Sequence, residues 1–187
     1  GSLAIDTLLE HRASAPWSAV RDRLQVRERE YAVLTLHRPA NVDHAVHLRQ
    51  LVDRLSAVSA HMPLVFPVHP RTARRFREQG LAPEEHGLRP IDPLGYREFL
   101  ALMDHAACVF TDSGGIQEET TVLGVPCFTL RDNTERPVTI DEGTNTLVMA
   151  DGRLLPGAFD DYLRTGGKRG RVPNLWDGQA GVRTAGI

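Results

Sequence analysis

The sequence predicts an α/β domain built on a doubly wound parallel sheet, a Rossmann-like fold. Five or six short apolar runs, rich in β-branched and aromatic residues, are expected to be strands. Segments with the apolar spacing of helices alternate with these runs, as is typical of parallel βαβ units. The chain has 187 residues, of which 41% are apolar and 25% charged. A chain of this size buries enough surface to hold its core together without disulfides or metal.

The elements follow in order along the chain. In the helical first 30 residues, Ile5, Leu8 and Leu9 share one face, and Pro16 precedes a second, charged helical turn at residues 21–30. Strands are expected at residues 31–37, 64–68, 88–91, 107–111, 125–130 and 146–149. Helices are expected up to about residue 60, at 71–79, 96–105 and 113–123, from Pro137, and at 154–164. Asn41 and Asp43 are candidate caps of the first of these helices, and Gly80 closes the second.

The composition excludes several classes of protein. The 22 basic and 24 acidic residues nearly cancel, which argues against a surface built for nucleic acid. No apolar run approaches 18 residues and no charged head precedes an apolar stretch, so we expect neither a membrane span nor a secretory signal. Cys108 and Cys127 lie in apolar runs and are expected to be free thiols in a reducing, cytoplasmic compartment.

Ligands of doubly wound sheets bind beyond the carboxyl ends of the strands, so the residues that follow each strand are the candidate site. These residues are His37-Arg38, His69-Pro70-Arg71, Asp92-Pro93-Leu94, Asp112-Ser113-Gly114-Gly115 and the loop from Arg131 to Arg136.

The segment from Thr111 to Glu119 is the most informative of these. A strand ends, two glycines allow close approach to the backbone, and the unpaired N–H groups of a helix start suit a phosphate. A carboxylate one or two turns later can accept hydrogen bonds from a ribose diol. The alternative is a Ser cap with acidic residues placed well against the helix dipole. No G-x-G-x-x-G pattern for a dinucleotide is present.

Three other positions have a functional and a structural interpretation. Arg136 precedes a proline, so its guanidinium is a candidate for a phosphate or carboxylate, or it pairs with Glu135 or Asp132. His37 can act as a general acid or stabilise a leaving phosphate, or it is a structural histidine. His69 has the same placement. The arginines after it, at 74, 75 and 77, form either a solvated face or an anion patch. His44 and His47 are expected on the surface, and we expect no metal site.

At these residues the chain resembles the C-terminal half of the non-hydrolysing bacterial UDP-N-acetylglucosamine 2-epimerases. The motifs that carry the resemblance are Asp112-Ser-Gly-Gly-Ile-Gln-Glu-Glu119, Leu123-Gly-Val-Pro126, Arg131-Asp-Asn-Thr-Glu-Arg-Pro137 with Gly143-Thr144, Leu36-His-Arg with Asn41, Pro67-Val-His-Pro70 and Asp177-Gly-Gln-Ala180. They cover roughly residues 3–183 in the family's order and spacing.

The resemblance implies one half of a GT-B-like protein, in which two Rossmann-like domains hold a nucleotide sugar between them. Residues 1–30 would be an interdomain linker helix and arm, residues 31–165 the nucleotide-sugar domain, and residues 166–187 a basic stretch and tail. The implied activity is interconversion of UDP-N-acetylglucosamine and UDP-N-acetylmannosamine, by elimination and re-addition of UDP without a redox cofactor. The implied setting is the biosynthesis of cell-surface polysaccharide, and the full-length enzyme is expected to be a homodimer.

The resemblance also implies a role for individual residues. Ser113, Gly114 and Gly115 would hold the diphosphate, Glu119 the ribose hydroxyls, and Arg38 and Arg136 the substrate. Leu94 and Phe99 would lie against the uracil, His37 would be the catalytic histidine, and His69 would contact an effector. Because the family's acidic catalytic residues lie in the N-terminal domain, this chain is expected to be inactive alone. Other possibilities are the donor-binding half of a GT-B glycosyltransferase, a non-catalytic nucleotide-sugar-binding module and a hydrolysing epimerase.

Overall fold

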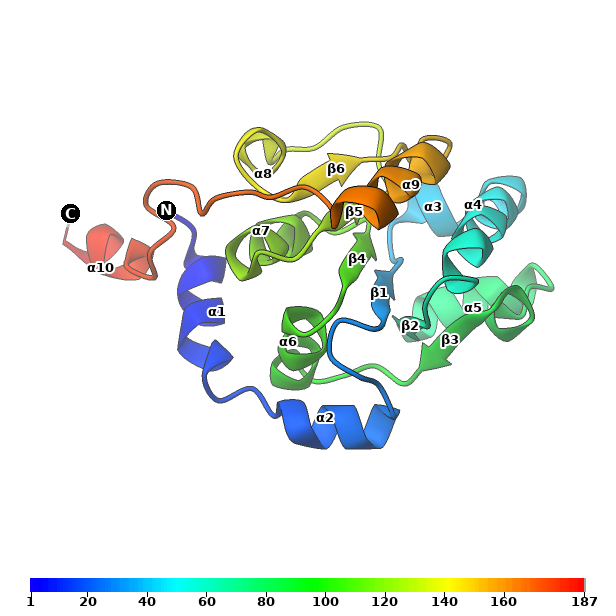
Figure 1. Cartoon of the computed structure of the whole chain (residues 1–187), viewed down its shortest axis with the longest axis horizontal. Coiled ribbons are helices and arrows are strands. Elements are labelled where there is room, and N and C mark those ends of the chain that lie inside the picture. Colours follow the sequence, from blue (N-terminus) through cyan, green and yellow to red (C-terminus); the bar gives the residue numbers. More distant parts are fainter. Residues whose placement is uncertain (187) are drawn as a thin grey trace.

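The computed structural model describes residues 1–186 and contains one six-stranded sheet with helices on both faces (Figure 1). The strands are β1 (Ala32–Thr35), β2 (Leu64–Pro67), β3 (Leu88–Ile91), β4 (Cys108–Thr111), β5 (Cys127–Thr129) and β6 (Asn145–Leu147). All neighbouring strands are parallel, in the order β3-β2-β1-β4-β5-β6. The predicted α/β fold with a doubly wound parallel sheet is therefore confirmed.

Helices connect these strands along the chain. The helices are α1 (Leu3–Arg12), α2 (Trp17–Leu24), α3 (Pro39–Val42), α4 (Ala45–Ser59), α5 (Pro70–Glu78), the 3-10 turn η1 (Pro83–His86), α6 (Tyr96–Asp104), α7 (Gly114–Leu123), α8 (Pro137–Asp141), α9 (Leu155–Thr165) and α10 (Ala180–Ala185). None of the helices within residues 1–186 is long and apolar enough to cross a membrane.

The core has two layers because side chains along a strand alternate between the faces of the sheet. Leu34 of β1 belongs to the cluster under α4, α5 and α9, whereas Val33 belongs to the cluster under α1, α2, α6 and α7. Both side chains are fully buried. The two layers hold β1 and β4 rigidly in the middle of the sheet, and this fixes the loops that follow them.

The N-terminal helices pack on the sheet domain differently from the prediction. Ile5 and Leu8 are buried, as expected, but Leu9 is 36% exposed. The second helix begins at Trp17 and ends at Leu24, before most of the predicted charged turn, because Gln25 adopts a left-handed conformation with φ of 50°. Helix α10 lies against α1, close to the start of the chain (Figure 1). The Asp6 carboxylate accepts from the backbone N–H groups of Ala180 and Gly181.

The predicted caps of the helix after β1 are wrong. A short helix, α3, contains Asn41, and the long helix α4 starts only at Ala45, with His44 as its N-cap and no side-chain cap. Asn41 is buried and is used elsewhere, because its amide donates to two groups at the carboxyl edge of the sheet. Asp43 forms ion pairs with arginines of α5.

Candidate functional site

The site begins where the central strands β1 and β4 end side by side. Thr35 and Thr111 are register partners, and their hydroxyl oxygens lie 2.6 Å apart. The chain continues from each strand into a predicted site segment, to His37 on one side and Asp112 on the other. Adjacent parallel strands thus bring together two segments that are 75 residues apart in sequence.

Asp112 is fully buried and its carboxylate is surrounded by donors. Its Oδ2 accepts from the backbone N–H groups of His37 at 3.0 Å and Arg38 at 2.9 Å, and from the Asn41 amide at 3.1 Å. The His37 Nδ1 lies 2.7 Å from its Oδ1. This contact lacks the alignment of a regular hydrogen bond, yet it raises the pKa of His37 above its ordinary value, against the effects of burial and of Arg38, while 52% of the imidazole remains exposed.

Arg38 is held across the same edge. Its Nε donates to the Asp112 backbone carbonyl at 2.9 Å, and its Nη2 lies 3.8 Å from Glu135 Oε1. Glu135 also accepts two hydrogen bonds of 2.6 Å from Arg131. This pairing lowers the pKa of Glu135 to about 2. A chain of charged groups therefore links the loop after β5 to the loop after β1.

The start of α7 is open to solvent on the side where a phosphate would bind. Ser113 is the N-cap by its backbone, but its side chain makes no cap hydrogen bond, so the predicted Ser cap is not formed. Its backbone N–H donates to the Thr111 hydroxyl at 3.0 Å. A Cβ built at Gly114 would meet no described atom within 4 Å, and neither Gly114 nor Gly115 has a positive φ. Packing and backbone conformation within the chain therefore do not require these glycines.

Glu119 lies on α7, half-buried, and faces α6. The Tyr96 hydroxyl donates to its Oε1 at 3.1 Å. Burial raises the pKa of Glu119, while the Tyr96 hydrogen bond lowers it in part. The second carboxylate oxygen has no partner among the described hydrogen bonds. The group keeps acceptor capacity, as recognition of a diol requires.

Arg136 pairs inside the chain, but with neither of the expected partners. Its Nε lies 2.9 Å from Oε1 of Glu118 on α7, without the alignment of a hydrogen bond, and 42% of its side chain is exposed. The predicted alternatives, Glu135 and Asp132, bond to Arg131 and to the Ala150 backbone N–H instead. The exposed part of the guanidinium remains free to face a ligand.

Gln117, which the sequence analysis did not assign to the site, connects the segment at residues 112–119 with the loop at residues 131–137. Its side chain is fully buried. Its Oε1 accepts from the Thr134 hydroxyl at 2.6 Å and from the Asn145 amide at 3.2 Å, and its Nε2 donates to the Ser113 carbonyl at 3.2 Å. The loop after β5 is thus fixed to the start of α7. Glu118 was likewise missed as an individual residue, whereas Asp112 was named among the residues that follow the strands but was given no role of its own. The one signal for Asp112 was its position directly after a buried strand.

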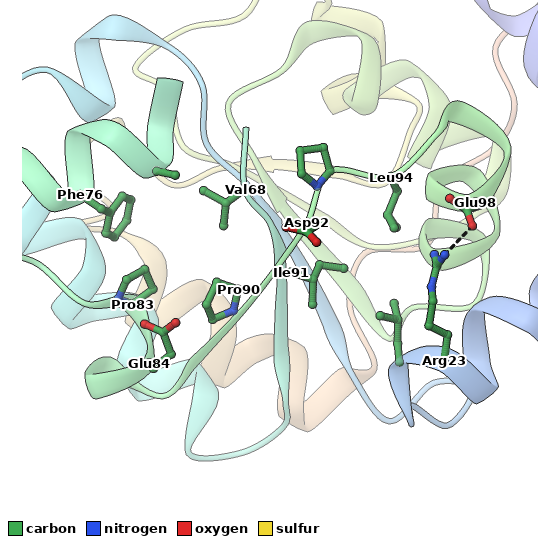
Figure 2. A pocket seen from close by; sticks show the side chains of 13 residues that line it. Arg23, Val68, Phe76, Pro83, Glu84, Pro90, Ile91, Asp92, Leu94 and Glu98 are labelled. Carbon is green, nitrogen blue, oxygen red and sulfur yellow. Dashed lines mark ion pairs between the residues drawn. The ribbon is translucent and has the colours of Figure 1, made fainter. Parts of the chain in front are cut away.

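The two residues expected beside the uracil are Leu94, which follows the edge strand β3, and Phe99, which lies on α6. Leu94 lines a hollow of about 680 Å³ along β3 (Figure 2). Figure 2 shows apolar side chains along its floor and the Arg23–Glu98 ion pair at one end. Phe99 does not line this hollow and packs, half-buried, against the core cluster under α6. Leu94 is also half-buried against this cluster, so the two side chains share one core layer, although Phe99 does not line the hollow.

The remaining candidates have structural partners. His69 is the N-cap of α5, and its Nδ1 accepts from the Arg71 backbone N–H at 3.2 Å. Arg75 pairs with Asp43 and Glu78, and Arg74 with Glu78, which favours a solvated, paired face over an anion patch. His44 is exposed, whereas the half-buried His47 bonds to the Ala150 carbonyl at 3.1 Å.

An open helix start, a carboxylate that keeps acceptor capacity and an imidazole lie together at the carboxyl edge of the sheet, where doubly wound α/β domains place their ligand sites. The chain belongs to the UDP-N-acetylglucosamine 2-epimerase family, whose model matches residues 1–187. The predicted resemblance to this family is confirmed.

Two archaeal relatives and their structures illustrate the similarity. The UDP-N-acetylglucosamine 2-epimerases of Methanococcus maripaludis and Methanocaldococcus jannaschii are each 43% identical, over 73% and 84% of this chain and 38% and 44% of their own length. Two solved structures of a UDP-GlcNAc 2-epimerase from Methanocaldococcus jannaschii match all of this chain and 54% and 53% of their own, with a TM-score of 0.83 and 34% identity, and one is described as a complex with UDP-GlcNAc and UDP. The chain spans about half the length of these relatives.

Proposed function

We propose that the chain is the UDP-binding part of an enzyme that interconverts UDP-N-acetylglucosamine and UDP-N-acetylmannosamine. The observation that carries this proposal is the geometry of residues 112–119. The two glycines at the start of α7 serve no packing or conformational need inside the chain, and Glu119 keeps a free acceptor further along the same helix. A ligand with phosphate groups and a diol would account for both features.

Each site residue then has a defined role. Gly114 and Gly115 bind the diphosphate through backbone N–H groups and Ser113 through its hydroxyl, which makes no cap hydrogen bond, and Glu119 accepts from the ribose hydroxyls. Arg38 and Arg136 supply positive charge to the substrate. Leu94 and Phe99 approach the uracil from the edge of the sheet, and His69 contacts an effector molecule.

The proposed reaction breaks the C1–O bond to UDP while a base removes the C2 proton, which leaves a 2-acetamidoglucal. UDP then adds back to C1 and a proton to the opposite face of C2. His37 faces the leaving diphosphate, since its imidazole is half-exposed beside the start of α7. The acids and bases that act at C2 are supplied by the other part of the family's architecture, so we expect no turnover by this chain alone.

The wider arrangement is part of the same proposal. Residues 1–30 act as the linker to an N-terminal domain, residues 31–165 as the nucleotide-sugar domain and residues 166–187 as the tail. We expect a homodimer of the full-length enzyme in the cytoplasm, in the supply of cell-surface polysaccharide. The two buried free cysteines fit a reducing compartment.

Binding of UDP to the 187-residue chain tests the proposal. We expect saturable shifts of the backbone amides of residues 113–119 in NMR spectra, and no shifts at Gly114 and Gly115 with uridine at the same concentration, because uridine lacks the diphosphate. Addition of UDP to several millimolar without change at these amides would contradict it. Proton NMR of UDP-N-acetylglucosamine turnover by the complete reading frame separates an epimerase from a hydrolysing enzyme or a glycosyltransferase.

A further inference from the structure

We propose that Asp112 is a positioning residue for His37, which it fixes with Nδ1–H toward the buried carboxylate and Nε2 toward the diphosphate site. The inference rests on the proposed function and adds a residue to it. Asp112 is fully buried, so we expect no direct contact between its side chain and the ligand. It acts through the imidazole, which does contact the ligand.

The carboxylate can do this because it is itself held in place. Two backbone N–H groups and the Asn41 amide bind its Oδ2, all within 3.1 Å, and the whole side chain is buried. Asn41 also donates to the Leu130 carbonyl at 3.1 Å, so three strand ends are tied to one point. The Oδ1 atom accepts from the His37 backbone N–H at 3.3 Å and lies 2.7 Å from the imidazole Nδ1.

The chemistry of a carboxylate then sets the chemistry of the ring. A carboxylate surrounded by donors can only accept, so the Nδ1 of His37 must carry a hydrogen. In the neutral ring, Nε2 therefore carries a lone pair and can only accept a hydrogen bond. In the protonated ring, Nε2 carries a hydrogen and can donate it, with positive charge on the ring, to a group in the solvent or in the ligand. The protonated form suits a leaving diphosphate, which gains negative charge as the C1–O bond breaks.

The charged groups around the ring favour this form. Asp112 faces it from the end of β4 and Arg38 from its own loop, while the Arg131–Glu135 pair lies behind Arg38 on the loop after β5. The contact with the Asp112 carboxylate outweighs the opposing effects of burial and Arg38, and the pKa of His37 is raised. The positive charge therefore persists to a higher pH than for a free histidine.

Nitrogen-15 NMR of the histidine rings in the 187-residue chain tests the inference, with His37→Gln to assign the signals. At high pH we expect the neutral His37 ring in the Nδ1–H tautomer, and its midpoint of titration above the ordinary value of 6.5. Asp112→Asn should return the midpoint to that value or below. A ring in the Nε2–H tautomer, or a midpoint unchanged by Asp112→Asn, would overturn the inference.

The tautomer is read in the wild-type chain, so the test stands even where Asp112→Asn fails to fold. Titration with inorganic pyrophosphate separates the inference from the proposed function. Because pyrophosphate itself ionises near neutral pH, the ratio of the wild-type affinity to that of His37→Gln is compared, and we expect this ratio to fall as pH rises through the His37 midpoint. The expected tautomer and midpoint, together with no binding of UDP or pyrophosphate, would contradict the proposed function and leave the positioning of His37 intact. A ratio that does not follow the His37 midpoint would overturn the inference.

Discussion

Replacing Gln117 with alanine tests whether the two motif segments are joined as one unit. Gln117 makes three hydrogen bonds in a fully buried position, to Thr134, Asn145 and Ser113. At about 1 kcal/mol for each hydrogen bond, the loss should be roughly 3 kcal/mol of unfolding free energy, and the Thr134 hydroxyl left without its acceptor adds to this cost. The loop after β5 would also lose its attachment to α7, so UDP affinity should fall as well.

Urea unfolding of the 187-residue chain measures the change in unfolding free energy. The dependence of that free energy on urea concentration should be the same for the wild type and the variants, which shows that they unfold in the same way. Gln79→Ala is the matched control. Gln79 is half-buried and its amide makes one hydrogen bond, to the Val42 carbonyl, while its Oε1 has no partner among the described residues. We expect about 1 kcal/mol or less for this control. Equal losses for the two variants would refute the special role of Gln117.

Three further substitutions have defined outcomes. Arg136→Ala should weaken UDP binding by roughly 1.5–3 kcal/mol in calorimetry of the full-length enzyme, the range for a charge-assisted hydrogen bond; unchanged affinity would make Arg136 a structural residue only. Glu135→Gln should lower stability above pH ~4.5, with the difference from wild type vanishing as pH falls through the Glu135 pKa of about 2, because Arg131 stabilises the carboxylate; a difference that persists at lower pH would contradict this pairing. Tyr96→Phe should raise the pKa of Glu119 further, followed by carbon-13 NMR, and a decrease would show that the hydroxyl does not donate to it.

Much of the fold was predictable because buried parallel strands appear as continuous apolar runs. Even the short edge strand β3, with Pro90 inside it, lies at the predicted residues. The failures fall where tertiary contacts override local preference. Asn41 is a favourable helix cap by residue type, but its amide instead donates a hydrogen bond to the buried carboxylate of Asp112.

The residues that carry the site were partly predictable, and their partners were not. Strand ends marked His37, Ser113 and Arg136 as candidates, since parallel strands bring their carboxyl ends to one edge. Which residue binds which depends on the strand order β1-β4-β5, which sequence spacing does not contain. The pair between Arg136 and Glu118 needs that order, because it joins a loop after β5 to the helix after β4.

UDP binding by this chain, with Glu119 on the ribose, is tested most directly by comparing two ligands. UDP and inorganic pyrophosphate are each titrated into the wild-type chain and into Glu119→Gln. In the proposed enzyme the ligand lies between two domains, and this chain supplies only one side of that site. We therefore expect a UDP dissociation constant of ~0.1 mM to a few mM in NMR titration. If Glu119 binds the ribose, Glu119→Gln should weaken UDP and leave pyrophosphate nearly unchanged. Equal weakening of both ligands would show that Glu119 shapes the helix without touching the sugar, and no binding of UDP at several millimolar would contradict the assignment of this chain as the nucleotide-binding part.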